Sequence, residues 1–129
     1  MTNSLDLISN GKNFAHVAIP REGTDPRVVL VWAKTDDDGN IRLNSAEGRA
    51  WPEDLRAAGR AIITVANHEN PYEYLTVTAR LAGDTHDGAE DEIDALAKKY
   101  LGQDRYPHRR PGEVRVTVKV TPEKIQSMG

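Results

Sequence analysis

The chain has 129 residues, no cysteine and a formal net charge of −3 at neutral pH, and 38% of its residues are hydrophobic. This length suits one domain, spanning residues 1–129, with a modest core. The absence of cysteine excludes disulfides, thiolate zinc sites and a cysteine nucleophile, and the slightly acidic balance argues against a nucleic-acid binder.

The hydropathy pattern predicts neither a membrane segment nor a targeting signal. No run approaches the roughly 18–20 apolar residues that a membrane helix needs. The N-terminal sequence MTNSLDLISNGK lacks the basic region and the apolar region of a secretory signal. We therefore expect a cytoplasmic protein with no membrane span.

The first third of the chain predicts a short helix and two strands. Residues 3–11 are expected to form the helix, which ends at Gly11. A strand over 13–19 follows. The next strand, 28–32 (VVLVW), is apolar at every position, which is typical of burial on both faces. In a small barrel, one face would meet the core and the other a second subunit or a ligand.

The middle of the chain predicts a hairpin and a helix. The Asp-Gly-Asn sequence at 38–40 favours a tight turn into a short strand that begins at Ile41. A helix is expected over 51–58, because Pro52 suits a first helical turn and Gly59 suits a helix end.

The remainder predicts three more strands and one helix. Strands are expected over 60–66 and 74–81, and the second alternates between apolar and polar residues. An apolar stripe predicts a helix over 88–101, and alternating valines predict a last strand over 114–120. The order predicts a mainly β (α+β) fold, a six-stranded antiparallel split β-barrel with small flanking helices.

Common catalytic and metal-binding signatures are absent from the sequence. It contains no G-x-S-x-G, G-x-G-x-x-G or P-loop motif. We interpret the acidic run 36–38 as a solvated hairpin tip and not as a cation site. The histidines lack metal-site spacing, and we interpret them as structural or solvated: His16, His68, His86 and His108. We therefore assign no catalytic acid or base and no metal ligand.

Two features leave a binding role open. The basic loop 108–110 lies between Pro107 and Pro111, and it could either hold an anion or form an ordinary exposed loop. Trp32 ends an apolar strand and Trp51 begins a helix. Such tryptophans usually pack in a core or an interface, but they also wall planar rings.

Several segments together carry a family resemblance: NFAHVAI followed by PRVVLVWAK, then IRLNSAEGRAW, NPYEYLTVTARLAG, IDALAKKYLGQDRYP and PGEVRVTVKVTPEKI. In this order they resemble the split β-barrel oxidoreductases related to pyridoxamine 5'-phosphate oxidase. The likeness is greatest to the branch that uses the deazaflavin coenzyme F420. It covers nearly the whole chain, and the Tyr-Leu-Gly helix end combined with the PGEVR strand start is fairly specific.

The resemblance implies a homodimer with a cofactor slot at its interface. It also implies hydride transfer from reduced F420 to a small organic acceptor, with the protein mainly positioning and desolvating the ring. The corner after the third strand would meet the ring and its phosphate. The residues assigned to the cofactor are Trp32, Ala33, Asn44, Ser45, Ala46, Glu47, Gly48, Arg49, Ala50, Trp51 and Arg56.

The sequence departs from the family pattern just after this corner. Where the family usually has lysine, arginine and asparagine, this chain has Trp51, Glu53 and Asp54. Carboxylates repel an anionic phosphate. Two alternatives therefore stand beside the F420 enzyme: an FMN-binding member of the same fold, and a non-catalytic barrel that lost the cofactor and binds another ligand. The candidate anion partners are Arg49, Arg56 and Arg60.

Overall fold

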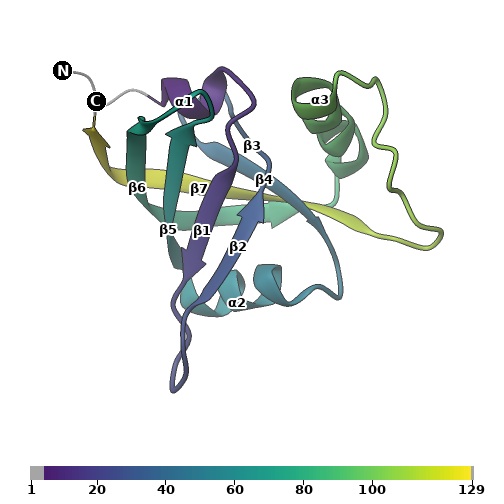
Figure 1. The fold of residues 1–129 in the computed structure, drawn as a ribbon. Coiled ribbons are helices and arrows are strands. Elements are labelled where there is room, and N and C mark those ends of the chain that lie inside the picture. Colours follow the sequence, from purple (N-terminus) through teal and green to yellow (C-terminus); the bar gives the residue numbers. More distant parts are fainter. Residues whose placement is uncertain (1–4, 129) are drawn as a thin grey trace.

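One continuous antiparallel sheet organises the chain in the computed structural model, which describes residues 5–128. The strands are β1 Ala15–Ile19, β2 Arg27–Val31, β3 Ala33–Thr35, β4 Ile41–Ala46, β5 Arg60–Asn67, β6 Asn70–Thr85 and β7 Arg115–Met128. The helices are α1 Asp6–Ser9, α2 Ala50–Ala58 and α3 Ala89–Leu101. The strand order is β2-β1-β5-β6-β7-β4-β3, and the sheet curls strongly (Figure 1).

The sheet has seven strands, so the predicted number of six is wrong, whereas the antiparallel, mainly β class is confirmed. The extra strand arises because the second predicted strand continues past Trp32 and changes partner there. Val31 is the last residue paired with β1, and Ala33 is the first paired with β4. One extended segment therefore contributes both edge strands, which curls the sheet back toward itself.

The interior of the curled sheet is filled by alternate residues of its strands. The predicted apolar face of β6 is confirmed, since Leu75, Val77 and Ala79 are at most 2% exposed. The last two strands run further than predicted. β7 continues through Pro122 because the ladder shifts register next to it, and proline is tolerated at such irregularities.

The predicted helices over 51–58 and 88–101 correspond to α2 and α3. Gly59 ends α2 in the left-handed conformation, with φ of 75°, and its N–H donates to the Leu55 carbonyl at 2.8 Å. The predicted helix 3–11 is only the four-residue α1, and residues 1–4 lie outside the described part. Within the described part, no helix has the length and apolar character to cross a membrane.

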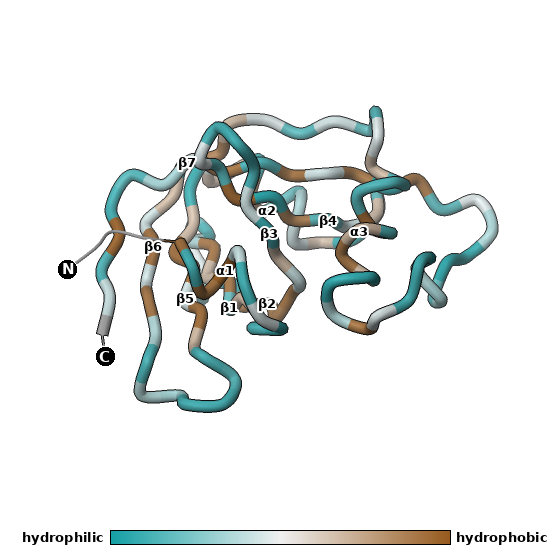
Figure 2. The backbone as a smooth tube through the Cα atoms, turned by 90° about the horizontal axis from the view of Figure 1, so that it is seen from above, coloured by the Kyte–Doolittle hydropathy of each residue, from teal (hydrophilic) through white to brown (hydrophobic). Residues whose placement is uncertain are grey.

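α3 and the loop after it extend to one side of the strands, as the view from above shows (Figure 2). The buried face of α3 forms a small hydrophobic cluster of its own, separate from the interior of the sheet. Its members are Ile93, Leu96 and Tyr100, with Trp32 and Tyr106 packed against them.

Two residues near the end of α3 attach it to the bend at Trp32, where the chain passes from β2 to β3. The Tyr100 hydroxyl donates to the Asn13 carbonyl at 2.6 Å and accepts the N–H of Ala33 at 3.2 Å. The Lys99 ammonium donates to the Ala33 carbonyl at 2.6 Å and to the Ile8 carbonyl. These bonds give buried backbone groups at the bend their partners.

The Lys99 attachment predicts a pH-dependent stability. Burial, followed by the charge of Lys34, lowers the pKa of Lys99 from 10.5 to about 8. Between these values the unfolded chain binds more protons than the folded one, so this group makes stability rise with pH. The Lys99→Met variant should lose that rise. Urea unfolding at about pH 7 and about pH 9.5 would measure it, and equal pH responses of the two proteins would contradict the assignment.

Candidate functional site

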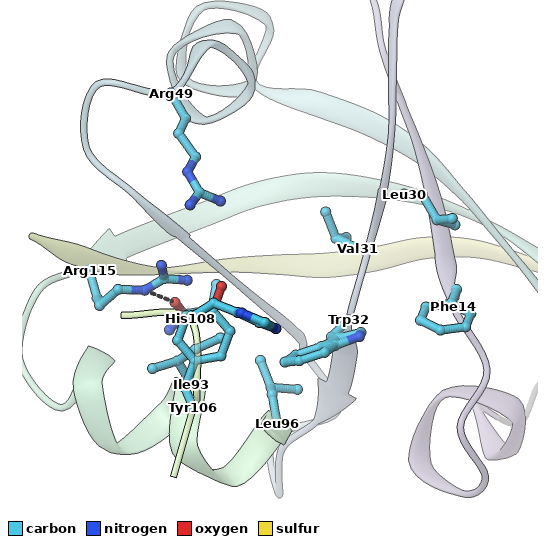
Figure 3. Close-up of a pocket in the computed structure, with 11 residues that line it drawn as sticks. Phe14, Leu30, Val31, Trp32, Arg49, Ile93, Leu96, Tyr106, His108 and Arg115 are labelled. Carbon is cyan, nitrogen blue, oxygen red and sulfur yellow. Dashed lines mark hydrogen bonds between the residues drawn. The ribbon is translucent and has the colours of Figure 1, made fainter. Parts of the chain in front are cut away.

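A pocket of about 270 Å³ opens where β2, β4 and β7 meet α3 and the loop 102–114 (Figure 3). It is lined by Phe14, Leu30, Val31, Trp32, Asn44, Arg49, Ile93, Leu96, Tyr106, His108 and Arg115. Figure 3 shows the two arginines on one side and Trp32 with Phe14 on the other. The pocket therefore has a basic side and an aromatic side.

The aromatic side is built around Trp32. Its indole stacks on Tyr100, with centroids 5.3 Å apart and planes 7° apart. The Tyr106 ring meets the indole edge-on at 6.0 Å and 89°. Flat apolar walls of this kind suit a planar ligand ring.

The basic side is built around Arg115, a cation that is only 3% exposed. Its Nε donates to Asn44 Oδ1 at 2.9 Å, and its guanidinium lies over the Tyr106 ring at 5.2 Å. The Asn44 amide in turn donates to the Ala89 carbonyl at 3.0 Å. One side chain of β4 therefore orients the arginine of β7 and ties both strands to α3.

Glu113 is the carboxylate that faces this arginine. Its Oε1 lies 3.1 Å from Arg115 Nη1 and its Oε2 lies 3.7 Å from Arg49 Nη2. The closer pair has ion-pair distance but not hydrogen-bond geometry, so both atoms are buried without a directed partner. Of the donors on the Arg115 side chain, only Nε forms a hydrogen bond to a described residue. Nη1 is therefore taken up by the buried ion pair with Glu113, and Nη2 is the donor without a partner among the described residues.

The loop that completes the pocket is fastened to α3. Arg109 donates to Glu90 and to Asp94, each at 2.8 Å, and the Tyr106 N–H donates to Asp94 at 2.8 Å. The bond from Arg109 holds the pKa of Asp94 below its ordinary value. Of the basic loop 108–110, His108 therefore reaches the pocket, while Arg109 serves to hold the loop.

The structure brings three of the predicted cofactor residues together, because Trp32, Asn44 and Arg49 all line the pocket. They come from the bend, from β4 and from the residue before α2. The other predicted residues do not line it: Ala33, Ser45, Ala46, Glu47, Gly48, Ala50, Trp51 and Arg56. Of these, Ala33, Ser45 and Ala46 are buried at the bend and in β4.

Arg56 is occupied by carboxylates elsewhere. It makes a two-pronged pair with Glu47 at 3.2 Å and a bond to Asp84 at 2.8 Å. His86 approaches the same Glu47 at 2.6 Å, and these contacts lower the pKa of Glu47. Arg56 therefore has far less capacity for an added anion than Arg49.

The departures from the family pattern lie on α2, and none of them lines the pocket. Trp51 is 7% exposed and packs into the main core, where a lysine would bury a charge. Asp54 pairs with Arg27, and Glu53 is exposed. The unusual residues at these positions therefore leave the pocket walls unchanged.

Sequence reasoning missed Arg115 and Tyr106. The PGEVR segment stood out as specific, but alternation along the last strand assigned its valines to the core and left Arg115 outward. The structure covers this strand on both faces: Val116 and Val118 are buried, and so are Arg115 and Thr117. Period-two alternation cannot reveal a strand that is covered on both faces.

No family model matches the sequence, and no curated protein matches it. Solved structures do. An F420 reductase superposes with a TM-score of 0.81 at 20% identity, covering 98% of each chain. A protein provisionally assigned as a pyridoxamine 5'-phosphate oxidase, from Listeria innocua, has a TM-score of 0.70 at 13% identity, covering 95% of this chain and 93% of its own.

A FAD-binding protein from Mesorhizobium loti is a further neighbour, with a TM-score of 0.68 at 19% identity over 94% of this chain and 87% of its own. At such identities the likeness concerns the fold alone. The chain has the fold of split-barrel proteins like pyridoxamine 5'-phosphate oxidase, some of which bind flavin or F420.

The central position of Asn44 predicts a stability loss on truncation. Asn44→Ala should leave Arg115 Nε unpaired, at a cost of about 1–3 kcal/mol for this buried group, and should also remove the bond that ties β4 to α3. Urea unfolding would measure the loss. Asn70→Ala, which truncates an exposed asparagine at the start of β6, should change stability by less than about 0.5 kcal/mol. Equal losses in both variants would contradict a special role for Asn44.

Proposed function

We propose that the protein is a flavin-type oxidoreductase that holds its cofactor ring in the pocket beside α3, with F420 as the first candidate. The observation that supports this most is the convergence of Trp32, Asn44 and Arg49 on one pocket. Asn44 and Arg49 belong to the corner segment and Trp32 to the preceding strand end, and the family resemblance implies a cofactor role for all three. The fold shared with an F420 reductase over 98% of both chains supports it further.

The residues present fit such a group. Trp32 offers a flat wall for a ring, and Arg49 offers a cation for its phosphate. The pocket volume of about 270 Å³ is just below the roughly 300–1,000 Å³ of typical ligand sites. A ring fits this space, and the rest of the cofactor would extend past Arg49 into the open.

When bound, reduced deazaflavin supplies a hydride, and the protein has other tasks. Trp32 would orient the ring and keep water from it. Arg49, whose side chain is about half exposed at the mouth, would bind the phosphate. The acceptor would be a small organic molecule beside the ring. FMN remains the alternative cofactor, which the FAD-binding neighbour favours.

We further propose that two copies of the chain complete the slot. The outer face of β2, β1 and β5 exposes large apolar side chains: Phe14 at 39%, Val28 at 64%, Leu30 at 58% and Ile62 at 48%. Val28 lies opposite Ala18, and Ala18 lies opposite Ile62, so these three side chains form a row, and Leu30 lies on the same face opposite the exposed His16. Phe14 and Leu30 also line the pocket, so a second copy covering the row would close it.

The cofactor proposal predicts different roles for two arginines. In fluorescence titrations with F420 and FMN, Arg49→Ala should weaken binding about tenfold or more, because charge-assisted hydrogen bonds contribute about 1.5–3 kcal/mol. Arg56→Ala, with the same charge change, should leave the affinity nearly unchanged, because Glu47 and Asp84 already occupy that arginine. If neither cofactor binds the wild-type protein, the non-catalytic alternative is the better function.

The assembly proposal predicts a dimer that depends on the exposed apolar row. Leu30→Glu should give a monomer in light scattering and weaken cofactor binding as well, because it charges a surface that must lose water. Leu101→Glu, at a leucine 42% exposed on the end of α3, is the matched control and should remain dimeric. A wild-type protein that is monomeric at micromolar concentration would refute the assembly.

A further inference from the structure

We propose that Arg115 forms a receptor for a planar carboxylate, which makes the acceptor of the reaction a conjugated carboxylic acid. Nothing in the family resemblance assigned Arg115 to a ligand. That the bound acid is the hydride acceptor rests on the proposed function, whereas carboxylate binding itself is measurable without any cofactor.

The first support is the state of the buried cation. Removing a guanidinium from water is costly unless its donors are paired. Arg115 is 3% exposed, yet only its Nε donates a hydrogen bond among the described residues. Nη1 faces Glu113 in a buried ion pair without hydrogen-bond geometry, and Nη2 has no hydrogen bond to a described residue, so Nη2 is a charged donor left for a carboxylate oxygen. Asn44 fixes the direction of the guanidinium, so the receptor is built before a ligand arrives.

The second support is the local charge. Two guanidiniums, those of Arg49 and Arg115, face the single carboxylate of Glu113, whose side chain is 9% exposed. The basic side therefore has one net positive charge. A monoanion would neutralise it, whereas a dianion such as a phosphate monoester would leave an uncompensated negative charge in a partly buried site. The arrangement favours a carboxylate over a phosphate monoester.

The third support is the surface next to the guanidinium. Tyr106 lies under Arg115 at 5.2 Å and meets Trp32 at 6.0 Å, so an aromatic wall leads away from the cation. Ile93 and Leu96 complete this side without adding charge. A ligand with its carboxylate on Arg115 would therefore lay a flat, apolar body along Tyr106, beside the ring that Trp32 orients.

A binding experiment on the full chain without cofactor tests the receptor. Benzoate, its neutral isostere benzamide and the dianionic isostere phenyl phosphate would each be titrated at about pH 8 and followed by tryptophan fluorescence, to which Trp32 in the pocket contributes. Benzoate should bind at least about tenfold more tightly than benzamide, and more tightly than phenyl phosphate. Benzamide binding as tightly as benzoate would overturn the proposal.

Substitutions test which residue binds the carboxylate of benzoate. Arg115→Gln should weaken benzoate binding at least about tenfold, with a melting curve to verify folding. Arg110→Gln removes the same charge from an exposed residue of the same loop that does not line the pocket, and it should have no effect. Glu113→Gln should tighten benzoate binding and shift the preference toward phenyl phosphate. This second variant decides the matter if Arg115→Gln does not fold, and an unchanged affinity would refute the receptor.

A last measurement separates this inference from the proposed function. Benzoate should still bind when the protein is saturated with F420. If F420 expels benzoate, the receptor serves the cofactor and the assignment to the acceptor is overturned. If benzoate binds but neither F420 nor FMN does, the oxidoreductase proposal fails while the carboxylate receptor stands.

Discussion

The rest of the structure depends on the change of strand partner at Trp32. The hydroxyl of Tyr100 stabilises this change. A strand that leaves one neighbour for another exposes backbone groups, and buried groups of this kind need partners. The Tyr100 hydroxyl accepts the N–H of Ala33 and donates to the carbonyl of Asn13, while the Lys99 ammonium donates to the carbonyl of Ala33. The bend and the helix therefore stabilise each other, and the pocket lies in the angle between them.

The basic side of the pocket is a poor way to stabilise a fold and a good way to prepare a binding site. Buried ion pairs often contribute little net stability, because desolvation offsets their attraction. Here Glu113 and Arg115 approach to 3.1 Å without a directed hydrogen bond. The Asn44 amide oxygen accepts from Arg115 Nε and so orients the guanidinium. Apolar side chains could have filled the same volume. The proposed carboxylate ligand would give this buried cation a role.

The exposed apolar face of β2, β1 and β5 and the pocket share Phe14 and Leu30, so the proposed dimer contact and the proposed binding site adjoin. A strand that is apolar at every position needs cover on both sides. Within one chain, Val29 and Val31 are partly buried, whereas Val28 and Leu30 remain largely exposed. Leu30 stands at the boundary of the two surfaces. Whatever covers the row also narrows the mouth of the pocket.

Local patterns in the sequence were enough to predict the mainly β antiparallel class, the bounds of α2 and α3 and the buried face of β6, because each depends on spacing within one element. The family resemblance added Trp32, Asn44 and Arg49. Only the tertiary structure revealed the seventh strand and the burial of Arg115. The change of strand partner depends on Tyr100, and the second covered face of β7 depends on α3. Both partners are distant in sequence, so the residue pattern within one strand cannot predict either feature.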